Sequence, residues 1–75
     1  MLGYAMLDVV AKAREFGRPF TAREMIAALP FAPDLTRMAL RASVNVGELV
    51  EGIRYLRRPG SMPREYTLPA EVRAP

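Results

Sequence analysis

The chain has 75 residues and a formal net charge of +3, and it contains ten arginines but no cysteine, histidine or tryptophan. A chain of this length forms one domain with a small core. The missing cysteine and histidine exclude disulfide bonds, structural zinc and most nucleophile–base pairs. Stability must therefore come from the core itself, a ligand or a partner subunit.

The first predicted element is an amphipathic helix over residues 2–16. Apolar residues recur there at steps of three and four, which places them on one helical face. These residues are Leu2, Met6, Val9, Ala13 and Phe16. Gly17 is well placed to stop the helix. Residues 18–20 include Pro19, which favours an extended connection over another helical turn.

The second predicted element is a short helix that starts directly after Thr21. Thr21 and Glu24 form the T-x-x-E pattern of a capping box, in which each side chain accepts a hydrogen bond from the other residue's backbone amide. Phe20 and Met25 occupy the two positions of a hydrophobic staple. Pro30 ends this helix after about two turns.

A third helix follows a turn that contains two prolines. Either Asp34 caps this helix or Pro33 is its first residue. The predicted buried face has the spacing of one helical stripe and consists of Leu35, Met38 or Ala39, Ala42 and Val46. Another face carries Thr36, Arg37, Arg41 and Asn45. Gly47 marks the expected end of the helix.

After the third helix the hydrophobic period changes to that of a strand. We expect a β-hairpin in which residues 50–57 pair with residues 64–68 across a proline-bounded loop. Residues 69–75 contain two prolines and little to bury, which predicts a flexible C-terminal tail. The expected domain therefore spans residues 1–68.

The positive charge is concentrated in the second half of the chain. Residues 1–35 carry four basic and four acidic side chains and are neutral. Residues 36–64 carry six arginines against two glutamates, a balance of +4. A basic half joined to a neutral half suggests a surface for an anionic polymer. Genome composition explains arginine in place of lysine, but it does not explain where the arginines lie.

The order helix, extended link, helix, tight turn, helix and hairpin resembles that of a winged helix-turn-helix. Residues 20–29, FTAREMIAAL, resemble the opening helix of its helix-turn-helix. Residues 36–51 resemble the recognition helix running into the wing through the G-x-L-V pattern. The resemblance covers about residues 2–68 and implies an α+β fold of three helices followed by a β-hairpin wing.

The resemblance also implies that the third helix enters the major groove of double-stranded DNA and that the hairpin tip lies along the backbone or minor groove. The residue types suit these roles, because arginine pairs with guanine, asparagine with adenine, and threonine with phosphate or a thymine methyl group. The candidate DNA-binding residues are Thr36, Arg37, Arg41, Asn45, Arg57, Arg58, Ser61 and Arg64. For the arginines the alternative is an ordinary solvated surface.

These features predict a small DNA-binding protein, either a sequence-specific transcriptional regulator or a recombination accessory factor of the type encoded by phages and mobile elements. One helix and a wing bury little surface on DNA, so we expect a homodimer or a cooperative oligomer on DNA. The surfaces available for it are helix 2–16 and tail 69–75. The alternative is a winged-helix protein-interaction module, an adaptor or inhibitor, that binds an acidic protein surface.

The sequence predicts no enzyme activity. Its acidic residues show neither metal-ligand spacing nor a neighbouring glycine-rich phosphate loop, so we expect no catalytic residue, cofactor, metal or small-molecule ligand. The longest run without charge is the nine residues 25–33, half of what a membrane span requires. The N-terminus lacks the basic stretch of a signal peptide. We therefore expect a cytoplasmic protein without membrane contact.

Overall fold

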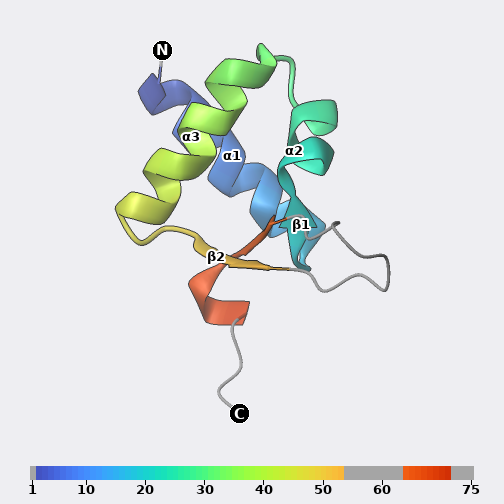
Figure 1. Ribbon diagram of the computed structural model, residues 1–75, viewed down its shortest axis with the longest axis vertical. Helices are drawn as coiled ribbons and strands as arrows, with labels where there is room; N and C mark the ends of the chain where they lie inside the picture. Colours follow the sequence, from blue (N-terminus) through green and yellow to red (C-terminus); the bar gives the residue numbers. More distant parts are fainter. Residues whose placement is uncertain (1, 54–63, 72–75) are drawn as a thin grey trace.

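The computed structural model describes residues 2–53 and 64–71, which form an α+β fold of three helices and a small three-stranded antiparallel sheet. In Figure 1 the helices lie together, and the sheet lies across one end of them. The elements in chain order are α1 (Leu2–Phe16), β1 (Phe20–Thr21), α2 (Ala22–Ala28), α3 (Pro33–Asn45), β2 (Val50–Ile53), β3 (Arg64–Thr67) and the 3₁₀ helix η1 (Pro69–Glu71).

α1 has the predicted bounds, and its buried face follows the predicted stripe. Ala5, Val9 and Ala13 are fully buried, and α1 packs mainly on α3. The larger residues of the stripe are half-buried at its edges; they are Leu2, Met6 and Phe16. Gly17 ends the helix with a φ of 61°, a conformation open to glycine at no steric cost. Its amide donates to the Ala13 carbonyl at 3.2 Å.

α2 begins with the predicted capping box. The Glu24 amide donates to Thr21 Oγ1 at 3.2 Å, and the Thr21 amide donates to Glu24 Oε1 at 3.0 Å. These two bonds satisfy donors that the first helical turn would otherwise leave open. Phe20 and Met25, the predicted staple residues, are both fully buried. The helix ends at Ala28, two residues before the proline that was expected to stop it.

α3 begins as one of the two predicted alternatives has it, but its buried face differs from the prediction. Pro33 is its first residue and no side chain caps it, so Asp34 is not the cap. The fully buried residues are Thr36, Ala39, Leu40 and Ser43. Of the expected face, Ala39 is buried and Leu35 and Ala42 are half-buried, whereas Val46 and Met38, the alternative to Ala39, are exposed. The buried face is thus rotated from the predicted one toward Thr36, Leu40 and Ser43, on the helix that packs mainly with α1.

The three strands form one sheet in the order β1-β3-β2. The predicted hairpin is present as β2 paired with β3, with Glu51 opposite Tyr66 and Ile53 opposite Arg64. The rest of the predicted first strand, residues 54–57, lies outside the described residues. The link before α2 was expected to be only an extended connection, but its last residue begins β1, in which Phe20 lies opposite Tyr66.

The segment after β3 is also more ordered than predicted at its beginning. Residues 69–71, expected to be part of a flexible tail, form η1. Pro69 and Ala70 of η1 lie beside Leu7 and Val10 of α1, with which they line a groove. The remainder of the predicted tail, residues 72–75, is not among the described residues.

The core lies where the helices meet the sheet. Phe20 is its largest fully buried side chain, and its ring stacks on Phe16 of α1 and on Tyr66 of β3, with centroids 5.1 and 6.0 Å away. The buried set consists of Ala5, Val9, Ala13, Phe20, Met25, Ala39, Leu40, Leu49 and Tyr66. Within residues 2–53 and 64–71, no helix has the length and apolarity required to cross a membrane.

Candidate nucleic-acid interface

The exposed face of α3 carries two arginines one helical turn apart. Arg37 and Arg41 follow at i, i+4, a spacing that puts both side chains on one face of a helix. Together with Asp34 and Met38 they line a shallow open depression of about 410 Å³. Both arginines are exposed, and the side chain of Arg37 retains 63% of its accessible surface. The charged atoms on this face can therefore reach a ligand from outside.

The two arginines differ in how their charge is balanced. Arg37 Nη1 lies 3.9 Å from a carboxylate oxygen of Asp34, a long ion pair between exposed groups. Such a pair contributes little to stability, because water screens both charges. Within the described residues, Arg41 has no ion pair. Arg41 is thus the more available of the two cations.

Thr36 was a candidate for DNA contact, and the structure corrects this assignment. Its side chain is fully buried, and its hydroxyl donates to the Ala32 carbonyl at 3.2 Å. A threonine in a helix can bury its hydroxyl when the hydroxyl donates a hydrogen bond to a backbone carbonyl of the preceding turn. Thr36 therefore packs in the core beneath α3 and cannot reach a groove of DNA.

Asn45 is the last residue of α3 and is exposed. It lies one turn beyond Arg41, so Arg37, Arg41 and Asn45 progress along the same side of the helix. The structure therefore keeps three of the four candidate residues of α3 on one accessible side.

Arg64, the candidate residue at the start of β3, is held by a carboxylate of the neighbouring strand. Its Nη1 lies 3.4 Å from Glu51 Oε1, across the antiparallel pair of β2 and β3. Arg64 and Tyr66 are two residues apart on one strand and Glu51 lies opposite Tyr66, so all three belong to the same face of the sheet.

The ionisation of Tyr66 links this cluster to α3. Burial raises the pKa of the Tyr66 hydroxyl, and the Glu51 carboxylate raises it further. The positive charges of Arg64 and Arg41 act on the pKa of Tyr66 in the opposite direction. Arg41 and Arg64 therefore both lie within electrostatic range of this hydroxyl, although one belongs to α3 and the other to the sheet.

Three further candidates, Arg57, Arg58 and Ser61, lie outside the described residues. The strands on either side of their segment are described, and they hold its ends together through the pairing of Ile53 with Arg64. The predicted contact of the hairpin tip with DNA remains a prediction.

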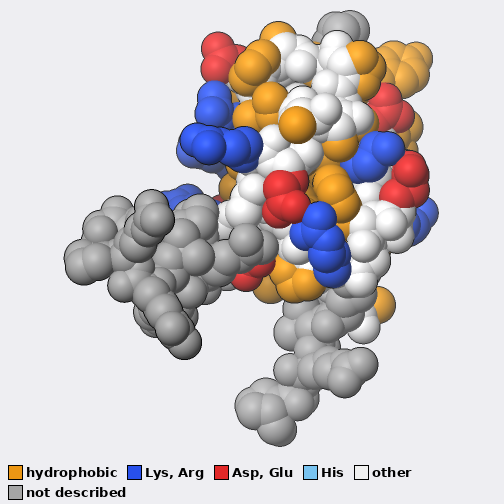
Figure 2. Space-filling model, turned by 90° about the vertical axis from the view of Figure 1, so that its right-hand side faces the viewer, with side chains coloured by type: hydrophobic (Ala, Val, Ile, Leu, Met, Phe, Trp, Pro, Cys, Tyr) orange, Lys and Arg blue, Asp and Glu red, His pale blue; other side chains and the backbone are white. Residues whose placement is uncertain are grey.

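The charge of the described surface is mixed. Figure 2 shows acidic and basic side chains interspersed, with apolar ones between them, on the face that it displays. Residues 2–53 and 64–71 also contain no group of acidic side chains that could hold a metal ion. The candidate interface among the described residues consists of Arg37, Met38, Arg41 and Asn45 of α3 together with Arg64 of β3.

Sequence reasoning missed the place of Met38 in this interface and the contact of Glu51 with Arg64. Met38 was expected in the core, but it is 57% exposed and lines the same depression as the two arginines. The sequence carried no signal for this, because both neighbours of Arg37 lie about 100° from it around the helix, and one of them, Thr36, is buried. The pairing of Glu51 with Arg64 depends on strand register, for which the sequence carried no direct signal.

Comparison of the chain with protein-family models, with curated proteins and with solved structures gives no significant match.

Proposed function

We propose that this protein is a small winged helix-turn-helix protein that binds double-stranded DNA, with α3 in the major groove. Its element order and its sheet order, in which the strand before α2 pairs with the last strand, are compatible with that fold. The proposed roles are those of a sequence-specific transcriptional regulator or a recombination accessory factor acting in the cytoplasm.

The observation that carries this proposal is the exposed face of α3, on which Arg37 and Arg41 line one shallow depression. A helix fits the major groove, and each arginine can donate two hydrogen bonds to a guanine there. Asn45, one turn further along, offers the hydrogen-bonding groups that suit adenine. Burial of Thr36 reduces the proposed set of base-reading residues to these three.

Arg64 supplies a proposed contact to the DNA backbone beside the helix. Its charge and that of Arg41 both act on the pKa of Tyr66 and lower it. Arg57 and Arg58 belong to the hairpin segment that follows Ile53 and precedes Arg64, and they are proposed to contact phosphates or the minor groove.

The test begins with selection of binding sites from random duplexes, followed by titration of the selected and a scrambled duplex. The double variant Arg37→Ala/Arg41→Ala should lose its preference for the selected duplex, because each arginine–guanine pair contributes about 1–3 kcal/mol of discrimination. The control Lys12→Ala/Arg23→Ala removes the same two positive charges from α1 and α2 and should keep the preference. Retained preference in the α3 variant would exclude α3 as the reading element.

Salt dependence separates DNA binding from other kinds of binding. The logarithm of the association constant should fall linearly with the logarithm of the salt concentration, by about 0.9 per phosphate contacted. Replacing Arg57 and Arg58 should weaken binding to all duplexes alike and reduce this slope by about 1 for each phosphate that the variant no longer neutralises. A shallow slope together with no selected sequence would reject the proposal.

One observation favours a second candidate function, an adaptor or inhibitor that binds an acidic protein surface. Met38 is exposed and lines the same depression as Arg37 and Arg41. Methionine is common on surfaces that bind protein partners, because its flexible thioether adapts to their shape. If Met38→Ala abolishes binding to a protein partner while duplex binding is absent at low salt, the second function replaces the first.

A further inference from the structure

A groove on the side of α1 away from the core carries the strongest evidence for a second interaction surface. It has a volume of about 540 Å³ and is lined by residues of α1, η1 and the two turns next to the sheet. Most of its lining is apolar; the lining residues are Leu7, Val10, Arg14, Glu48, Leu68, Pro69 and Ala70. It is formed only because η1 lies against α1.

The apolar part of this surface continues along α1. Leu7 is 68% exposed, and Tyr4, three residues earlier, is 73% exposed. Leu7, Val10 and Arg14 recur at steps of three and four, so they form one stripe on the helix. Two large apolar side chains that stay exposed on one helix of a 75-residue chain do not contribute the free energy that their burial would provide. A partner that covers this stripe would bury them and gain that free energy.

The charges that line the groove suit a second copy of the chain. Arg14 and Glu48 both line the groove, and within the described residues neither side chain makes an ion pair. One unpaired cation and one unpaired anion beside an apolar floor make a self-complementary patch. A two-fold dimer places the same patch on both subunits, so a contact between residue i and residue j occurs twice.

We propose that this groove is the interface with a second copy of this chain. Arg14 of each subunit pairs with Glu48 of the other subunit, while Leu7 and Tyr4 of both subunits cover each other. This dimer forms without DNA and does not depend on the function proposed for α3, which lies on a different set of residues.

Charge reversal tests the pairing directly. The dissociation constant of the dimer is measured by sedimentation equilibrium of the purified full chain without DNA. Arg14→Glu and Glu48→Arg should each weaken the dimer at least about tenfold, because each places two like-charged pairs in the interface. The double variant Arg14→Glu/Glu48→Arg restores opposite charges across the two-fold axis, and its dissociation constant should return to within about threefold of the original.

Two further variants control this experiment. Arg23→Glu makes the same charge change on α2, away from the groove, and should leave the dimer unchanged. Leu7→Glu places a charge on the apolar floor and should give a monomer that melts cooperatively, since Leu7 makes few contacts in the free subunit.

Three results would overturn the proposed interface. The first is a wild-type protein that sediments as a monomer up to about 1 mM. The second is an Arg14→Glu variant that dimerises as well as Arg23→Glu. The third is a double reversal that remains as weak as the single reversals.

Discussion

Two buried hydroxyl groups of α3 differ in their hydrogen bonding. Thr36 and Ser43 are both fully buried. The Thr36 hydroxyl donates to the Ala32 carbonyl, whereas the Ser43 hydroxyl has no hydrogen-bond partner among the described residues. Burial of an unpaired hydroxyl costs about 1–3 kcal/mol, so Ser43 lowers the stability of a domain that can spare little.

Ser43→Ala should therefore stabilise the protein, because it removes the unpaired hydroxyl and introduces a better helix-forming residue. We expect a gain of about 1 kcal/mol and a Tm increase of about 4–8 °C in thermal melts. Thr36→Ala is the matched control, and it should destabilise the protein because it deletes a bonded hydroxyl and a buried methyl group. A lower Tm for Ser43→Ala would mean that its hydroxyl has a stabilising partner.

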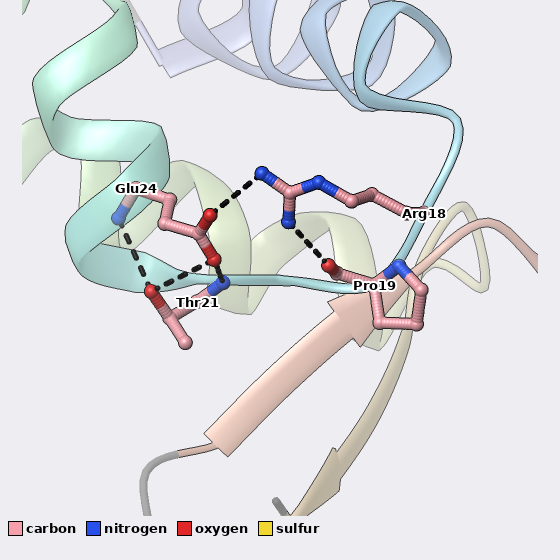
Figure 3. A network of polar contacts seen from close by, with 4 residues as sticks. All are labelled: Arg18, Pro19, Thr21 and Glu24. Carbon is pink, nitrogen blue, oxygen red and sulfur yellow. Dashed lines mark hydrogen bonds and ion pairs between the residues drawn. The ribbon is translucent and has the colours of Figure 1, made fainter.

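Glu24 makes stability depend on pH. Figure 3 shows its carboxylate between Arg18 and Thr21. Arg18 Nη2 donates to Oε2 at 2.8 Å, and this bond, followed by that from the Thr21 amide, lowers the pKa of Glu24 below its ordinary value of 4.5. A carboxyl group whose pKa is lower in the folded state stabilises the protein at pH values above its pKa in the unfolded state. This stabilisation is lost as the pH falls through the pKa of the folded state.

The variant Glu24→Gln tests this contribution. Glutamine can still accept the capping hydrogen bond from Thr21 but cannot form the ion pair with Arg18. The wild-type free energy of unfolding in urea should fall between about pH 5 and pH 3, and the variant should be less stable at pH 7 with a flatter profile. Parallel profiles for the two proteins would contradict the assigned role.

At the scale of an element, the end of α3 depends on one backbone conformation. Gly47 has a φ of 83° and follows the last turn of the helix. Its amide donates to the Val44 carbonyl at 3.1 Å. The next two amides, those of Glu48 and Leu49, both donate to the backbone carbonyl of Ser43. This arrangement satisfies carbonyls at the helix end and turns the chain into β2.

Gly47→Ala should destabilise the protein by about 1–2 kcal/mol, because an L-residue with a side chain is strained at positive φ. Apart from the neighbouring residues of the chain, no atom of residues 2–53 and 64–71 lies within 4 Å of where the new Cβ would be, so the expected cost is that of the backbone. Gly3→Ala is the same change inside α1, also in open space, and should stabilise the protein by about 0.5–1 kcal/mol. Denaturant melts in which both variants change stability in the same direction would reject this explanation.

At the scale of the whole molecule, Phe20 connects the helices to the sheet. It belongs to β1, directly precedes the capping residue of α2, and stacks on Phe16 and Tyr66. A 75-residue domain has a free energy of unfolding of about 4–11 kcal/mol. The free energy lost when one ring is removed at this position is therefore a large part of the free energy of unfolding.

Phe20→Ala should cost about 3–5 kcal/mol, because it leaves a cavity where three parts of the fold meet. We expect the Tm of the variant, measured by circular dichroism, to lie far below that of the wild-type protein. Phe20→Leu retains much of the buried volume and should fold with less than half of that loss. A small effect of Phe20→Ala would show that the helices and the sheet are held together elsewhere.

Local patterns in the sequence were sufficient to predict the helices. The bounds of α1 follow from a regular apolar stripe and Gly17, and the start of α2 follows from the capping box of Thr21 and Glu24. The pairing of β2 with β3 follows from alternating residues on either side of a turn. Each of these signals acts over a few residues, so the sequence contains it directly.

The candidate interface was predictable only in part. The exposure of Arg37, Arg41 and Asn45 agrees with the sequence analysis, whereas Thr36 and Met38 lie on the opposite sides of α3 from those expected. Threonine can be buried when its hydroxyl bonds to the preceding helical turn, and single large apolar side chains can lie at the surface, so hydrophobicity alone did not orient the helix.

The sequence by itself thus determined the three helices, the capping box of α2 and the location of the basic residues, because these depend on neighbours along the chain. The tertiary structure decided which side of α3 is buried, since that depends on the small residues of α1 more than twenty positions away. It also decided that Phe20 and Thr21 become a strand, because β1 exists only through its hydrogen bonds to β3. Contacts between distant segments are set by how whole surfaces fit together, and no local pattern encodes them.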